Sequence, residues 1–96
     1  MNDSNFDWDD ANIAHVAEHE VTPEEAEQVL LGNPLELSFE AGPGGEDRWA
    51  FLGETDETRI LQVAITMRGE KIRVVTAFEP AKRLRKLYLQ LKAEQK

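Results

Sequence analysis

The sequence predicts one α+β domain, in which an antiparallel sheet lies between two short acidic helices before it and a long basic helix after it. Apolar residues recur at helical spacing before residue 32, at every second position between residues 35 and 78, and at helical spacing again after residue 80. The chain has 96 residues, 41% of them hydrophobic, which suffices for one core but not for two. We therefore expect residues 1–96 to form a single domain.

The first predicted helix spans residues 10–19. Ile13 and Val16 fall at helical spacing along it. Asp9 and Asp10 precede them as candidate caps, and their carboxylates suit the positive end of the helix dipole.

The second predicted helix starts at a capping box. The Thr22 hydroxyl can accept a hydrogen bond from the backbone of Glu25, Glu25 can return the bond, and Pro23 suits the first helical position. The helix is expected to end at Gly32, because glycine tolerates a left-handed cap and Pro34 cannot continue the helical hydrogen bonds.

A period of two then predicts four strands in meander order. The Gly42–Gly45 stretch lacks the Lys-Ser/Thr pair of a phosphate loop, so we interpret it as a mobile hairpin connection. A short extended piece at residues 6–8 is the candidate for a fifth strand. The four expected strands are residues 35–40, 48–52, 58–67 and 71–78.

The alternation also predicts which side chains share a face of the sheet. On the first strand, Leu35, Leu37 and Phe39 are expected on one face. On the fourth strand, one face is expected to carry Ile72, Val74 and Thr76, and the other Arg73, Val75 and Ala77.

The last predicted helix opens after Glu79-Pro80 and is amphipathic and basic. Its apolar stripe is Leu84, Leu87, Tyr88 and Leu91. Lys82 and Arg83, with the other bases of the helix, could track phosphates while a tyrosine ring stacks on a base. The alternative is a solvated face that balances the acidic half of the chain.

Composition excludes several classes of protein. The chain has no cysteine, so it can form neither a disulfide nor a thiolate zinc site. Its start is acidic where a signal peptide is basic, and no apolar stretch is long enough to cross a membrane. We therefore expect a cytoplasmic protein that does not contact membranes.

The charge is distributed unevenly. The net charge of −8 disfavours nucleic-acid binding, but residues 1–47 carry −13 and residues 48–96 carry +5. This asymmetry predicts either two faces of opposite potential or extensive ion pairing between the halves.

Two histidines stand four residues apart on the first predicted helix. His15 and His19 have the spacing of a metal-binding pair, but no third ligand follows at a recognisable spacing, so we expect no metal site. We therefore interpret both as surface or helix-packing histidines. A nearby acid would let His19 donate or accept a proton near neutral pH.

Four arginines lie on or beside predicted strands, where side chains from neighbouring strands can converge. Arg73 should lie on the face opposite Ile72 and Val74. It would there either pair with an acid across the sheet, such as Glu36 or Glu40, or bind a phosphate. The four are Arg48, Arg59, Arg68 and Arg73.

Several segments together resemble the BrnT-like toxins, over roughly residues 6–88. The opening segments of the resemblance are Phe6-Asp7-Trp8-Asp9 and His19-Glu20-Val21-Thr22-Pro23-Glu24-Glu25. The later ones are Arg48-Trp49-Ala50-Phe51-Leu52-Gly53 and Arg73-Val74-Val75-Thr76-Ala77. Their order and spacing along the chain match those of the family.

The resemblance implies a RelE-like fold and the toxin of a type II toxin–antitoxin pair, a ribonuclease that needs neither metal nor cofactor and is neutralised by a ribbon–helix–helix antitoxin. It implies catalytic roles for His19 and Arg73 and RNA contacts for a wider basic set: Arg48, Arg59, Arg68, Lys82 and Arg83. Arginine or lysine would stabilise charge on the scissile phosphate while a second group moves the proton of the 2′-hydroxyl.

The chain departs from the family where a phosphate-binding charge is expected. Family members commonly carry an arginine after the Ser/Thr-Ala pair, where this chain has Phe78 and then Glu79, and a glycine where it has Glu20. The alternative is therefore a catalytically inactive member of the superfamily that acts as a protein-binding module. The sequence leaves a homodimer open.

Overall fold

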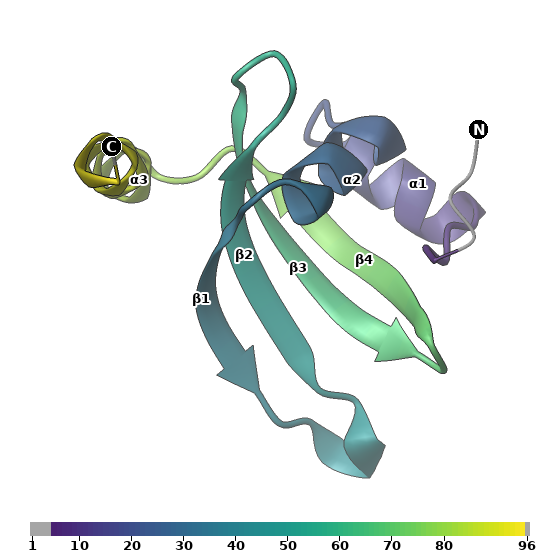
Figure 1. The fold of residues 1–96 in the computed structure, drawn as a ribbon. Coiled ribbons are helices and arrows are strands. Elements are labelled where there is room, and N and C mark those ends of the chain that lie inside the picture. The colour runs from purple at the N-terminus through teal and green to yellow at the C-terminus, as the bar shows by residue number, and fades with distance from the viewer. Residues whose placement is uncertain (1–4, 96) are drawn as a thin grey trace.

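The computed structural model describes residues 5–95, which form three α-helices and one four-stranded antiparallel sheet. The strand order is β1-β2-β3-β4, so the expected α+β class and the expected meander are confirmed (Figure 1). The elements are α1 (Asp10–Ala17), α2 (Pro23–Leu31), β1 (Leu35–Glu40), the short 3-10 helix η1 (Pro43–Gly45), β2 (Arg48–Glu54), β3 (Ile60–Arg68), β4 (Lys71–Phe78) and α3 (Lys82–Glu94).

Both short helices begin at the expected caps. The Asp9 side chain accepts a hydrogen bond from the backbone of Asn12, and the Thr22 hydroxyl accepts one from Glu25 at 3.1 Å. Glu25 accepts in return from the backbone of Thr22 at 3.0 Å, which completes the predicted capping box.

α2 ends at Gly32 as expected, but not in the left-handed conformation. Gly32 has φ −76° and ψ −131°. A Cβ there would lie 3.2 Å from the carbonyl oxygen of Gln28, so a larger residue would have to displace this carbonyl by a few tenths of an ångström. Gly53 lets α2 approach the sheet in the same way, since a Cβ on it would meet Val29 at 3.0 Å.

The main core lies between α1, α2 and one face of the sheet. Val16 and Val29 from the helices meet Leu61, Val63 and Val74 from the strands, all of them almost fully buried. A smaller cluster forms where Leu52, Ile60 and Tyr88 meet, on the side chains that alternate to the other face of β2 and β3. α3 therefore packs on the sheet face that α1 and α2 leave open.

Two irregularities overturn the predicted faces of the edge strands. The register of β3 and β4 shifts between Ala64 and Ile65, so Val74 and Ala77 both enter the core, although a strict period of two placed them on opposite faces. The register of β1 and β2 shifts between Glu36 and Ser38, and Phe39 contacts Trp49 instead of sharing a face with Leu35. One inserted residue reverses every later side chain of a strand.

Residues 6–8 do not form a fifth strand. Phe6 makes an isolated parallel bridge with Ile72, whose backbone N–H donates to Asn5 and whose carbonyl accepts from Asp7, both at 2.8 Å. This bridge holds the N-terminal segment against the outer edge of β4. Within residues 5–95, every helix is too short or too polar to span a bilayer.

Candidate functional site

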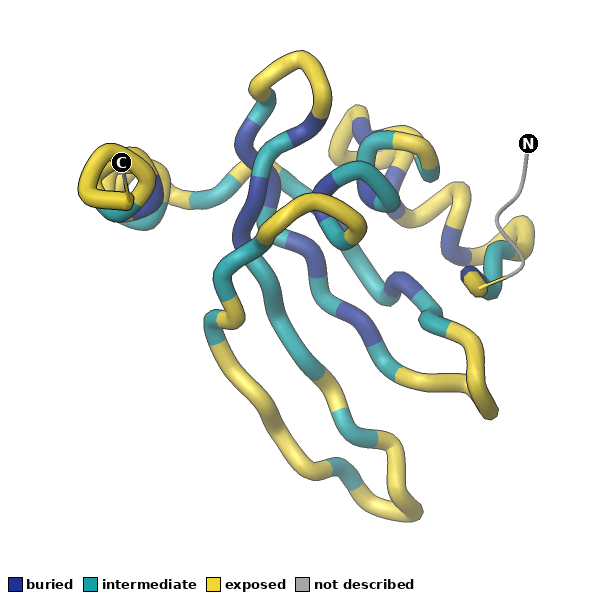
Figure 2. The backbone as a smooth tube through the Cα atoms, viewed as in Figure 1, coloured by how far each residue is buried: buried dark blue, intermediate teal, exposed yellow. Residues whose placement is uncertain are grey.

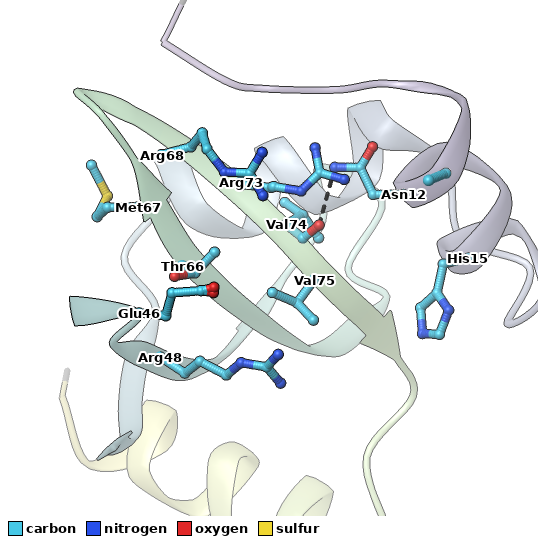
Figure 3. Close-up of a pocket in the computed structure, with 11 residues that line it drawn as sticks. Asn12, His15, Glu46, Arg48, Thr66, Met67, Arg68, Arg73, Val74 and Val75 are labelled. Atoms are coloured by element: carbon cyan, nitrogen blue, oxygen red, sulfur yellow. Dashed lines mark hydrogen bonds between the residues drawn. The ribbon is translucent and has the colours of Figure 1, made fainter. Parts of the chain in front are cut away.

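A groove of about 420 Å³ lies on the open face of the sheet, next to α1. The register of the strands explains which residues line this groove. Arg48 on β2 and Arg73 on β4 are both paired with Thr66 on β3, so the three side chains form a row across three strands. Adjacent strands lie about 4.8 Å apart, which separates the outer two backbones by about 10 Å. Arg68 follows on the same face two residues after Thr66, and all four side chains line the groove (Figure 3).

Arg73 is held by two carboxylates. Its Nη1 lies 3.0 Å from Oδ2 of Asp9 and 3.5 Å from Oδ2 of Asp7, and its Nη2 donates to Oδ1 of Asp9 at 3.2 Å. The hydrogen bond from Arg73 holds the pKa of Asp9 below its usual value, and the same bond raises the pKa of Arg73. The guanidinium is therefore fixed in place, with 14% of its side chain exposed.

The expected pairing of Arg73 with Glu36 or Glu40 is wrong. Both acids lie on β1, and two strands separate β1 from β4. The acids that pair with Arg73 belong instead to the N-terminal segment bridged to β4.

Asn12 fixes that segment. Its side-chain amide donates to the carbonyl of Asp7 at 3.0 Å and to the carbonyl of Val74 at 3.1 Å, and the residue is 4% exposed. The second bond joins α1 to the edge of β4 and is drawn in Figure 3. Asn12 thereby positions the carboxylates that orient Arg73.

The other two arginines of the groove are exposed. Among residues 5–95, Arg48 and Arg68 form no ion pair. Glu46 and His15 line the same groove, and Figure 3 shows them on opposite sides of Val75. The groove thus combines two free cations, one fixed cation and two side chains that can carry protons.

Arg59 does not line the groove, whereas the other three arginines on or beside the strands do. Its Nη1 lies 3.0 Å from Oε1 of Glu25 and donates to the carbonyl of Glu20 at 2.8 Å, while its Nε lies 3.1 Å from Oε2 of Glu79. Burial alone would raise the pKa of Glu25, but the Thr22 backbone bond and Arg59 together hold it below its usual value. Arg59 ties α2 to the segment after β4.

His19 does not line the groove that contains the three arginines. It lines a separate hollow of about 320 Å³ with Arg59 and Phe78, and its ring centroid lies 5.7 Å from that of Phe78. His15, one turn earlier, reaches the groove, and the two imidazole centroids are 6.1 Å apart. The proton-transfer role expected of His19 stays a prediction, and the sequence marked His15 beside the arginines only through its four-residue spacing from His19.

Glu46 was also missed. It follows the 3-10 turn and precedes β2 by two residues, and the only signal for it was its closeness in sequence to Arg48. Lys82 and Arg83 are exposed in the first turn of α3 and line no part of the groove. In the part of the chain that the structure describes, no three His, Asp or Glu side chains are arranged to hold a metal ion.

A small α+β domain with arginines from three strands, a histidine and a carboxylate around one open groove has the elements of a protein that acts on a phosphodiester. Residues 8–83 match the family model of the ribonuclease toxin BrnT of type II toxin–antitoxin systems, and the chain belongs to this family. Membership implies an antitoxin partner. No curated protein matches the sequence.

Proposed function

We propose that this chain is an endoribonuclease toxin that cuts RNA without a metal ion, in the groove on the open face of its sheet. The observation that supports this most is the row of Arg48, Thr66 and Arg73 across three strands, extended by Arg68 and bordered by His15. Guanidinium groups bind phosphate oxygens with two parallel hydrogen bonds, which makes arginine suited to such a row.

Each charged side chain of the groove has a role in the proposed reaction. Arg48 and Arg68 are free to bind the phosphates of the strand, while Arg73 is preorganised to meet the negative charge that develops on the scissile phosphate. A base takes the proton of the 2′-hydroxyl, the 2′-oxygen attacks phosphorus, and the 5′-oxygen leaves with a proton from an acid. His15 and Glu46 are the side chains at hand for these two transfers.

We propose His15 for the histidine role that the resemblance assigned to His19. Arg59, Lys82 and Arg83 are proposed as secondary RNA contacts at most, since none of them lines the groove. The proposed place of action is the cytoplasm, and the proposed partner is a ribbon–helix–helix antitoxin. Sedimentation of the purified protein tests whether two copies associate.

A second function is favoured by one observation. Phe78 and Glu79 stand where the family commonly carries cationic residues, and here Phe78 contacts His19 while Glu79 neutralises Arg59. These two positions therefore supply no cation to an RNA. A catalytically inactive member that acts as a protein-binding module would have this arrangement.

The test is induced expression in a bacterial host, followed by growth and by the integrity of total RNA, with Arg73→Ala and His15→Ala as variants and His19→Ala as the matched control. The expected result is growth arrest with RNA loss, abolished by Arg73→Ala and reduced about 10²-fold or more by His15→Ala in a purified assay with EDTA. Intact RNA and normal growth with soluble, folded protein would favour the binding module instead. Loss of activity in His19→Ala but not in His15→Ala would return the role to His19.

A further inference from the structure

A second groove, of about 430 Å³, lies on the sheet face that carries α1 and α2, beyond the part of the face that those helices cover. Figure 1 shows both helices over one end of the strands, with the strands continuing past them, and Figure 2 shows the far ends of the strands largely exposed. The groove has a mainly apolar lining, to which all four strands and the end of α2 contribute residues. Its apolar members include Phe6, Leu31, Trp49, Phe51, Met67 and Ile72.

Large apolar side chains are exposed around this groove. Leu31 at the end of α2 is 64% exposed, Met67 on β3 is 43% exposed, and Phe39 beside Trp49 is 49% exposed. Exposed apolar side chains that group around one groove are a mark of an interaction site. A helical layer that covers only one end of an apolar sheet face leaves room for one more helix beside α2.

The charges of this groove are all negative. Glu36 and Glu70 are the charged side chains that line it, and among residues 5–95 neither forms an ion pair. An apolar floor between unpaired carboxylates is complementary to a segment with apolar residues on one side and Lys or Arg beside them.

We infer that this groove is the docking site for an amphipathic, basic helix of the antitoxin. The inference rests on membership of a toxin–antitoxin family and not on catalysis. Met67 lines both this groove and the arginine groove on the other face, so the two grooves meet at the turn between β3 and β4.

The test uses a 14-residue helical peptide of leucine and lysine, with the leucines on one face. The protein carries Trp8→Phe, so that Trp49 in the groove is the only tryptophan and its emission reports occupancy. The expected result is a blue shift on titration, with the dissociation constant raised at least tenfold by Leu31→Glu. Leu89→Glu, on the exposed side of α3 at 47% exposure, is the matched control and leaves the constant unchanged.

The two charge-matched variants separate docking from general attraction. Both add one negative charge to an acidic protein, so unspecific binding of a cationic peptide would be equal in them or stronger than in the parent. Equal weakening in both, no weakening in Leu31→Glu, or equal binding of the same peptide with glutamate for lysine would overturn the inference. A parent protein that sediments as a dimer and becomes monomeric in Leu31→Glu would also overturn it, because the groove would then hold a second copy. RNA cleavage is measured separately, so a protein that binds the peptide but cuts no RNA leaves this inference standing and removes the catalytic one.

Discussion

The two ends of the β2–β3 ladder carry the same residue type in opposite circumstances. At one end, Arg59 is half-buried and bound to two carboxylates and a backbone carbonyl. At the other end, Arg48 and Arg68 are exposed beside a groove and form no ion pair within the described chain. An arginine with all its partners inside the fold is a structural link, whereas one with none keeps its hydrogen bonds for a ligand.

Arg73 lies between these two cases. It has carboxylate partners, yet it lines the groove and points into the row with Arg48 and Thr66. A cation held in one orientation costs less reorganisation when charge develops next to it than a mobile one does. Its partners Asp7 and Asp9 therefore serve the groove as well as the fold.

The largest contrast is expected in RNA cleavage. Arg48→Ala and Arg68→Ala should each lower the cleavage rate about 10²-fold, because each removes a charged donor that nothing else in the groove replaces. Arg59→Ala should change the rate less than about threefold once corrected for folded fraction, because it lines neither groove. Initial rates on a defined RNA would check this. A loss of cleavage rate in Arg59→Ala as large as in Arg48→Ala would contradict the distinction between the two ends of the β2–β3 ladder.

The reverse contrast is expected in stability. Arg59→Ala should lower the free energy of unfolding by about 1–2 kcal/mol, because Glu25 and the carbonyl of Glu20 lose a charged partner in a half-buried place. Arg48→Ala should change it by less than about 0.5 kcal/mol, as is usual for an exposed side chain without partners. Urea denaturation of both variants measures the difference. An unchanged midpoint for Arg59→Ala would show that its contacts contribute nothing net.

Lowering the pH should weaken the contact between Glu25 and Arg59, with a smaller loss of unfolding free energy than Arg59→Ala causes. The pKa of Glu25 is lowered in the fold from its usual 4.5, so its contribution is complete above that pH and is lost as the pH falls through the lowered value. Glu25→Gln keeps the capping box but not the charge, so we expect its unfolding free energy to fall less steeply between pH 6 and about 3.5, by less than about 1 kcal/mol. Parallel slopes for this variant and the parent would remove Glu25 from the acid response.

The smallest effect is expected at Glu79. Its side chain is 66% exposed, so the ion pair with Arg59 is largely screened, and Glu79→Gln should cost only a few tenths of a kcal/mol. Thermal unfolding at low and at high salt would check this. A cost above about 1 kcal/mol would mean that Glu79, and not Glu25, is the main partner of Arg59.

Local signals predicted much of the fold. The capping box of Thr22 and Glu25, the bounds of β1 and β4 and the meander order all follow from patterns that involve neighbouring residues. The errors lie where one residue is inserted into a strand. A strict period of two assigns every side chain after the insertion to the wrong face of the sheet, as it did for Ala77 and Phe39.

The site was predicted less completely, for reasons of geometry. In an antiparallel meander, Arg48 and Arg68 stand at one end of their strands and Arg59 at the other, so the predicted order already separated them. The same order placed two strands between Glu36 and Arg73. The pairing of Arg73 with Asp7 depends on a single bridge beside β4, for which the sequence carries no periodic signal. His15 was recognisable only as the neighbour of His19 one helical turn away.

The attachment of α3 has a consequence for hydrogen exchange. Tyr88 is the only buried residue of the helix, and its hydroxyl shares Glu54 with Lys92. A helix held by one buried ring, one half-buried leucine (Leu84) and one carboxylate can detach while the main core stays closed, as a unit with its own opening equilibrium. The amides of α3 then exchange with solvent through this partial opening, at rates that the global stability does not determine. The amides of β3 exchange only when the whole domain unfolds.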